Sequence, residues 1–140
     1  MTRQGAMTLL LALVFTLSGC TYRASTSTNY PVIDGHNSRN ALDWAGTYTG
    51  VLPCADCAGL ETTLIIRTDA SYHLETRPLG KGDRLFEEQG TFTWLDGGNV
   101  IQLNDGVTRY QVGENRLFLL DRRGRRITGD LATHYILHKE

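Results

Sequence analysis

The chain has 140 residues and a formal net charge of −1. This length suits one compact domain, and the charge lacks the basic excess of a nucleic-acid-binding protein, so we expect no nucleic-acid partner. The first element in chain order is an apolar run from Ala6 to Leu17. It is too short for a membrane-spanning helix, which needs about 20 residues. Its length instead matches the apolar core of a secretory signal peptide.

Directly after the apolar run, Leu17-Ser18-Gly19-Cys20 resembles a lipobox, in which small residues precede a cysteine that is acylated and becomes the new N-terminus. The alternative is an ordinary signal peptide with a cysteine nearby by chance. The lipobox predicts a signal peptide over residues 1–19 and a membrane anchor on Cys20, since several acyl chains hold a protein stably on a bilayer. Thr21, rather than Asp, follows the cysteine. In bacterial lipoproteins this favours the outer membrane, with the domain in the periplasm or at the cell surface.

Residues 20–42 are rich in Ser, Thr and Asn, a composition typical of a flexible tether. From residue 43 onward the pattern changes to short, β-branched and aromatic segments separated by turn signals. Strands are expected at 44–52, 60–68, 71–79, 85–95, 100–103, 107–112, 116–121 and 134–139. These eight strands predict an all-β fold, an antiparallel meander closing into a barrel or a distorted sandwich.

Period-two alternation predicts which side chains face the interior of this barrel. Gly90 is expected to mark a bulge or bend inside the strand at 85–95. Trp44 and Trp94 are expected to be core residues or plugs at the barrel end. The expected interior residues are Leu64, Ile66, Phe92, Trp94, Leu103, Leu117, Leu119 and Ile136.

Three cysteines are an odd number for an exported protein, but a lipidated Cys20 leaves Cys54 and Cys57 as a pair in "VLPCADCAGLET" (51–62). In an oxidising envelope the two can form a disulfide. Alternatively, two thiolates form a soft site for a metal such as Cu(I). A thioredoxin-like redox role would need a βαβ context, which the surrounding strands do not provide. Disulfide and metal site both stay open, because a disulfide can be reduced and then bind metal.

Two other groups are weaker candidates. His134 and His138 lie four apart in the last expected strand and would share a face, where they could act as borderline metal ligands or be simply solvated. The segment "DRRGRR" (121–126) could meet anionic lipid or an acidic partner, or form a solvated hairpin loop. Its basic residues are Arg122, Arg123, Arg125 and Arg126. The sequence contains no nucleophile motif or phosphate loop, so we expect no enzymatic activity.

The segment "GVLPCADCAGLETTL" (50–64) closely resembles the signature of the NlpE family, outer-membrane lipoproteins linked to envelope-stress signalling, surface adhesion and copper homeostasis. The segments "YHLETRPLG", "FEEQGTFTW" and "LFLLDRRGRRI" follow the same family pattern. The resemblance runs from Trp44 to the C-terminus. It implies a lipocalin-like β-barrel over residues 43–140 that carries the cysteine pair on one loop. It also implies copper as a candidate ligand and an envelope-stress sensor protein as a candidate partner.

Larger members of the family carry a second domain with its own cysteine pair after the barrel, and this chain ends at Glu140. The resemblance therefore extends to the N-terminal barrel domain alone. Two functions follow as hypotheses: a stress-sensing or copper-handling lipoprotein that acts through its cysteine loop, or a lipocalin-like module that holds a small apolar molecule. An apolar interior cavity of about 300 Å³ or more would favour the second.

Overall fold

The computed structural model describes residues 36–82 and 84–140. The expected signal peptide and Cys20 lie outside these residues. The described residues form nine strands: β1 (Gly46–Leu52), β2 (Leu60–Ile66), β3 (Ser71–Pro78), β4 (Phe86–Thr91), β5 (Thr93–Leu95), β6 (Val100–Gln102), β7 (Arg109–Gly113), β8 (Arg116–Leu119) and β9 (Ile136–Lys139). They also form the helix α1 (Ser38–Ala41) and the 3-10 helices η1 (Asp96–Gly98) and η2 (Ala132–Tyr135). Within this part of the chain, no helix has the length and apolar character needed to cross a membrane.

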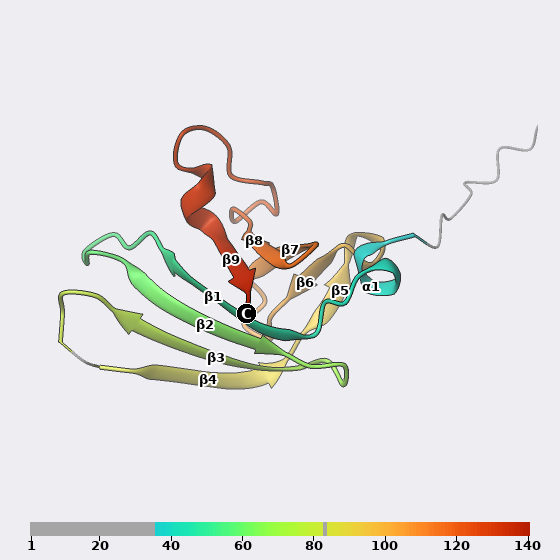
Figure 1. Cartoon of the computed structure of the whole chain (residues 1–140), viewed down its shortest axis with the longest axis horizontal. Coiled ribbons are helices and arrows are strands. Elements are labelled where there is room, and N and C mark those ends of the chain that lie inside the picture. The colour runs from blue at the N-terminus through green and yellow to red at the C-terminus, as the bar shows by residue number, and fades with distance from the viewer. Residues whose placement is uncertain (1–35, 83) are drawn as a thin grey trace, which may run out of the picture. The chain divides into compact units, whose positions relative to one another are not determined.

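All these strands belong to one antiparallel sheet with the order β4-β3-β2-β1-β9-β8-β7-β6-β5. Figure 1 shows β1 to β4 side by side as one broad, curved layer. The C-terminal strand β9 lies between β1 and β8 and so joins the two halves of the meander. The two ends of the order, β4 and β5, are consecutive in the chain, so the sheet curls into a nearly closed barrel. The prediction of an all-β antiparallel barrel is confirmed.

The hairpin of β2 and β3 shows why these residues form strands. In β2, Thr62, Leu64 and Ile66 are buried on one face while the residues between them are more exposed, as period-two alternation predicts. The connecting turn is closed by Asp69, whose Oδ1 accepts the backbone N–H of Ser71 at 2.9 Å and its hydroxyl at 2.6 Å. An Asp side chain that bonds the backbone two residues later is a common turn device. This local geometry fixes the register of both strands.

The core fills the inside of the barrel with aromatic and aliphatic side chains. Five of the eight expected interior residues are buried, and Trp94 and Leu119 pack against them partly exposed. The buried core residues are Tyr48, Leu52, Leu64, Ile66, Tyr72, Phe92, Ile101, Leu103, Tyr110, Val112, Leu117 and Leu137. Burial, with the Asp43 charge adding to it, raises the pKa of Tyr48 to about 12. The tyrosine hydroxyl stays satisfied because it donates to the Trp44 carbonyl at 2.7 Å.

The predicted strand at 85–95 is two strands in the structure, which is why there are nine rather than about eight. The break falls at Phe92, whose backbone N–H donates to the Ala70 carbonyl at 2.9 Å. The Phe92 ring is buried and forms a T-shaped aromatic cluster with Trp44 and Trp94. The expected bend at Gly90 is wrong, since this residue pairs with Tyr72 inside β4. The chain turns two residues later, where the barrel closes.

The last strand begins two residues later than predicted. His134 lies in η2, and β9 starts at Ile136. The inward position belongs to Leu137, which is fully buried, while Ile136 is only partly buried and outside the core cluster. The expectation that Ile136 faces the core is therefore wrong. A shift of one residue moves every side chain of a strand to the opposite face.

The compact part of the chain also begins before residue 43, the boundary drawn from composition. Helix α1 is capped by Asn37, whose side chain accepts the backbone N–H of Asn40. Ser38 donates its backbone N–H to Asn99 Oδ1 at 3.0 Å and its hydroxyl to the Val112 carbonyl at 2.7 Å. These polar contacts hold α1 against the barrel, and a composition rich in Asn and Ser gave no sign of them.

Candidate functional site

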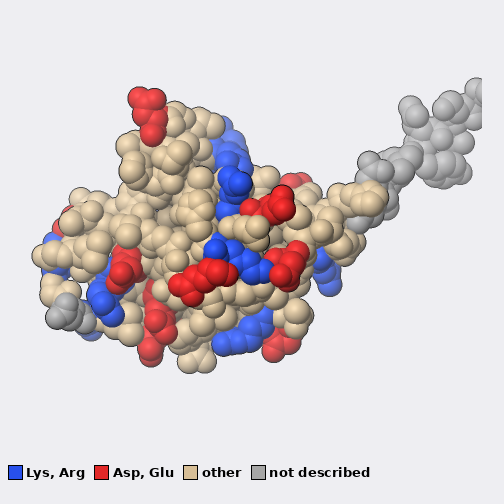
Figure 2. Space-filling model, viewed as in Figure 1, with Lys and Arg blue, Asp and Glu red and all other residues tan. Residues whose placement is uncertain are grey.

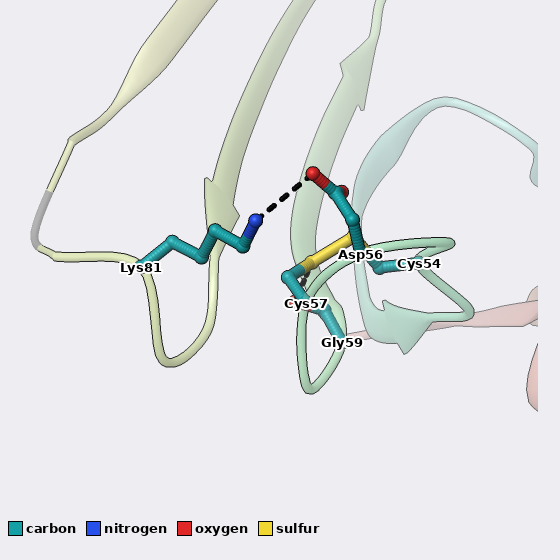
Figure 3. Close-up of polar contacts among 5 residues, drawn as sticks. All are labelled: Cys54, Asp56, Cys57, Gly59 and Lys81. Atoms are coloured by element: carbon teal, nitrogen blue, oxygen red, sulfur yellow. Dashed lines mark hydrogen bonds and ion pairs between the residues drawn. A yellow bond between two sulfur atoms is a disulfide. The ribbon is translucent and has the colours of Figure 1, made fainter.

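The Cys54–Cys57 pair lies in the loop between β1 and β2, at one end of the barrel. The two residues form a disulfide, with their Cα atoms 5.3 Å apart. Figure 3 shows the sulfur bridge closing a tight turn, with Asp56 at its outer side. The structure thus contains the disulfide that the cysteine count left as one of two alternatives.

Backbone hydrogen bonds tie the cysteine turn to the loop that follows β3. Ala58 donates to the Leu79 carbonyl at 3.0 Å, and the Leu79 N–H donates to the Gly59 carbonyl at 2.8 Å. Lys81 adds an ion pair to Asp56, with 3.0 Å between Nζ and Oδ2 (Figure 3). Both side chains of this pair are more than half exposed, so it adds little stability. The turn is therefore anchored mainly through its backbone.

Gly59 is required by the close approach of β1 at the base of the turn. A Cβ atom at this position would lie 2.5 Å from Cγ1 of Val51, which is too close for two carbon atoms. A residue without a side chain removes this clash. The glycine two residues after the second cysteine thus allows the base of the turn to pack closely against β1.

The donor atoms around the disulfide are two sulfurs and one carboxylate. Cys54 Sγ lies 3.7 Å from Asp56 Oδ1, and Cys57 Sγ lies 3.2 Å from the Gly59 carbonyl oxygen. One potential ligand atom from each of Cys54, Asp56 and Cys57 lies within 4.8 Å of the others. While the sulfurs are joined, they are not thiolate ligands. After reduction, two thiolates at this spacing would suit a soft ion such as Cu(I).

A cleft of about 310 Å³ opens beside the cysteine turn. It is lined by Val51, Leu52, Pro53, Cys54, Ala58, Gly59, Leu131 and His134. Two of these apolar side chains, Val51 and Leu131, are 50% and 61% exposed. The cleft therefore presents an apolar surface next to a sulfur atom, an arrangement suited to contact with another protein or a peptide.

The two candidate histidines do not share a face. His134 lines the cleft together with Cys54, whereas His138 is exposed on β9 opposite Thr49 and Arg116. The proposed pairing of the two as metal ligands rested on a regular strand over both residues, and η2 removes that basis. Their roles as ligands stay predictions, and only His134 lies next to the cysteine turn.

The sequence comparison identifies the family of this fold and cysteine turn. Residues 48–130 match the family described as the NlpE N-terminal domain. The chain belongs to the NlpE family.

Relatives with this domain agree in sequence and in structure. The chain is 32% identical over 114 residues to "Lipoprotein NlpE" of Escherichia coli (strain K12), covering 79% of this chain and 47% of that protein. It thus spans about half the length of the curated relative. A crystal structure of a putative lipoprotein from Shewanella oneidensis superposes with a TM-score of 0.72 at 52% identity, covering 76% of this chain and 97% of that one. The E. coli "Cpx pathway activator NlpE" superposes with a TM-score of 0.50 at 31% identity, covering 61% and 46%.

The barrel interior of this NlpE family member is largely filled. A hollow of about 200 Å³ is lined by Leu52, Leu60, Thr62, Leu74, Thr76, Thr108, Tyr110 and Leu119. Its volume is below the roughly 300 Å³ at which ligand pockets usually begin. The aromatic rings of Tyr48, Tyr72 and Tyr110 are buried in the core and occupy much of the interior. The interior therefore favours the cysteine loop over the barrel cavity as the functional site.

The arginine-rich segment forms a closed loop after β8, as one of the sequence hypotheses predicts. Asp121 Oδ1 accepts the backbone N–H groups of Arg123 and Arg125 at 2.8 and 2.9 Å. Arg126 packs over the Phe118 ring at 3.4 Å from its centroid. The exposed side chains that stay available for an anionic partner are those of Arg122 and Arg123. On the face shown in Figure 2, basic and acidic side chains are intermixed.

The Asp121 hydrogen bonds predict a stability contribution that is lost in acid. The Arg125 N–H, helped by that of Arg123, holds the pKa of Asp121 below its ordinary value of 3.8. A lowered folded-state pKa stabilises the fold above the ordinary value, and this contribution disappears as the pH falls through the folded-state pKa. Wild type is therefore expected to be more stable than Asp121→Asn at neutral pH, with the difference shrinking below 3.8. Urea unfolding across this range measures it, and a difference independent of pH would contradict the assignment.

Proposed function

We propose that this chain is a lipid-anchored envelope protein that takes part in stress signalling through its Cys54–Cys57 turn. The observation that carries the proposal is a disulfide in an exposed turn beside an apolar cleft, in a chain of the NlpE family. The name of the E. coli relative, a Cpx pathway activator, supports a signalling partner in the envelope. The lipobox at residues 17–20 supports an anchor on Cys20 in the outer membrane.

The switch in this proposal is the redox state of the two sulfurs. An envelope dithiol would supply two electrons and two protons, the S–S bond would break, and Cys54 and Cys57 would become thiols while the dithiol becomes a disulfide. The reduced pair fits copper, because soft thiolates select Cu(I) over harder ions. Bound copper would supply a soft cation that joins the two thiolates. Asp56 offers a third donor but is already paired with Lys81.

The cysteine turn contacts two other parts of the surface. A structural change in the turn would therefore alter the surface that a partner protein meets. On one side it is hydrogen-bonded to Leu79 in the loop after β3. On the other side, Cys54 lines the cleft together with Leu131 and His134. Opening the disulfide removes the covalent restraint between these two surfaces. A partner that recognises the cleft would then meet a different arrangement of its wall.

The test is a Cu(I) titration of the chain lacking residues 1–20, in reduced and oxidised form, beside Cys54→Ser/Cys57→Ser. We expect the reduced protein to bind one Cu(I) per chain. The oxidised protein and the double variant are expected to bind at least about 100-fold more weakly, since even outer-shell partners of a metal site contribute 10–100-fold. His138→Ala is the matched control and should bind like wild type. Equal uptake by the reduced protein and the double variant would remove copper from the proposal.

A further inference from the structure

A second group of metal-ligating side chains lies on the outer surface of the barrel, away from the cysteine turn. Tyr72 is buried and Leu74 packs against the core. The alternate residues of β3, His73 and Glu75, therefore point outward. Glu87 of the neighbouring strand β4 lies directly opposite Glu75 in the antiparallel register. Two adjacent strands thus bring one imidazole and two carboxylates to the same patch of surface.

These three side chains are close enough to share one ion. His73 Nε2 lies 3.0 Å from Glu75 Oε1, and the two side chains are 16% and 37% exposed. One ligand atom from each of His73, Glu75 and Glu87 lies within 4.8 Å of the others. Ligand atoms of a tetrahedral zinc site, with bonds of about 2.0–2.2 Å, are roughly 3.3 Å apart. The exposed side chain of Glu87 is free to change rotamer and bring its carboxylate to this spacing.

The charges of the patch are unbalanced without a cation. Two carboxylates directly opposite each other on neighbouring strands destabilise the pair. Within residues 36–82 and 84–140, neither Glu75 nor Glu87 forms an ion pair with Lys or Arg. Between β2 and β3, by contrast, an acidic residue faces a basic one: Glu61 lies opposite Arg77 and contacts it at 3.6 Å. The fourth neighbour on the patch is Gln89, opposite His73, whose amide carbonyl is a further oxygen donor.

We propose that His73, Glu75 and Glu87 form a binding site for a divalent transition-metal ion of the zinc type. One imidazole nitrogen and two carboxylate oxygens are ligands that Zn²⁺ uses in proteins, with water completing the coordination. The ion would neutralise the two facing carboxylates and link β3 to β4, which lies at one end of the strand order and pairs with β3 alone. The site shares no residue with the cysteine turn, so a negative result for this site would not contradict the proposed function, and the reverse also holds.

The test is Zn²⁺ titration by calorimetry on the full chain in detergent, with the Cys54–Cys57 disulfide kept oxidised so that it offers no thiolate. We expect one ion per chain in the micromolar range. His73→Ala should abolish this binding, and Glu87→Gln should weaken it at least about tenfold, at the low end of what one partner contributes. Glu61→Gln is the matched control, because Glu61 lies on the outer face of the next strand but outside the patch; it should bind like wild type.

Thermal unfolding provides the second readout. Zn²⁺ should raise the Tm of wild type and of Glu61→Gln, since a ligand that binds the folded state stabilises it. It should leave the Tm of His73→Ala unchanged, and circular dichroism without metal checks that this variant is folded. Binding weaker than about 1 mM in wild type, or unchanged binding in a folded His73→Ala variant, would overturn the proposal.

Discussion

Leu64→Ala is expected to lower the free energy of unfolding by about 2–5 kcal/mol, the range for a buried leucine truncated to alanine. Leu64 is fully buried at the centre of β2, between the buried Thr62 and Ile66, and pairs with Tyr48 across the strand. The variant leaves a cavity that the rigid aromatic ring of Tyr48 cannot readily fill. Urea unfolding at equilibrium measures the difference.

The matched control for this prediction is Leu131→Ala, the same substitution at a leucine that is 61% exposed. It should change the free energy of unfolding by less than about 0.5 kcal/mol. Similar losses in both variants would mean that the interior of the barrel is not packed around Leu64 as described.

Gly90→Val is expected to destabilise the fold by about 1–3 kcal/mol through overpacking. A Cβ atom at this position would lie 2.4 Å from Nδ2 of Asn104 and 3.0 Å from Cε1 of Tyr72. The Tyr72 hydroxyl lies within hydrogen-bonding reach of Asn104 Oδ1 and Glu88 Oε1, and its single proton can be donated to either one. A side chain on Gly90 therefore displaces Asn104 from its contact with Tyr72.

A double-mutant cycle separates this clash from the strand preference of valine. In an Asn104→Ala background, Gly90→Val should cost at least about 0.5 kcal/mol less than in wild type, because residues in contact couple by this amount or more. Both unfolding free energies come from the same urea measurements. Additive effects of the two substitutions would contradict the contact between Gly90 and Asn104.

The fold is largely predictable from sequence because alternation and turn chemistry are local. Leu64 and Ile66 are assigned correctly by period two alone. The break at Phe92 is not visible in this way, since the alternation runs through Thr91-Phe92-Thr93 without interruption. The break depends on barrel closure, a tertiary requirement that overrides the local strand pattern.

The three buried tyrosines show a second limit. Tyr48, Tyr72 and Tyr110 are fully buried or nearly so, yet a tyrosine in a strand is equally suited to a half-exposed position. For two of them the hydroxyl has a hydrogen-bond partner, which is the Trp44 carbonyl for Tyr48 and a side chain of another segment for Tyr72. The partners of Tyr72, Glu88 and Asn104, lie on other segments, so its burial is not evident from its own strand.

At the candidate site, counting cysteines predicts the pair but not its surroundings. The contact between Gly59 and Leu79 follows from extending the β2–β3 register past Leu60 and Pro78. The position of the hairpin turn at Asp69 is therefore enough to predict which residues lie opposite the cysteine turn. The position of His134 could not be predicted in this way, because the 3-10 helix η2 interrupts a segment whose sequence resembles a continuous strand.

The proposal that Cys54 and Cys57 together form the sensing site is tested by copper X-ray absorption on the reduced chain loaded with one equivalent of Cu(I). We expect a first coordination shell containing two sulfur atoms, and loss of both in Cys54→Ser/Cys57→Ser. A shell of nitrogen and oxygen atoms alone in the reduced wild-type protein would contradict it.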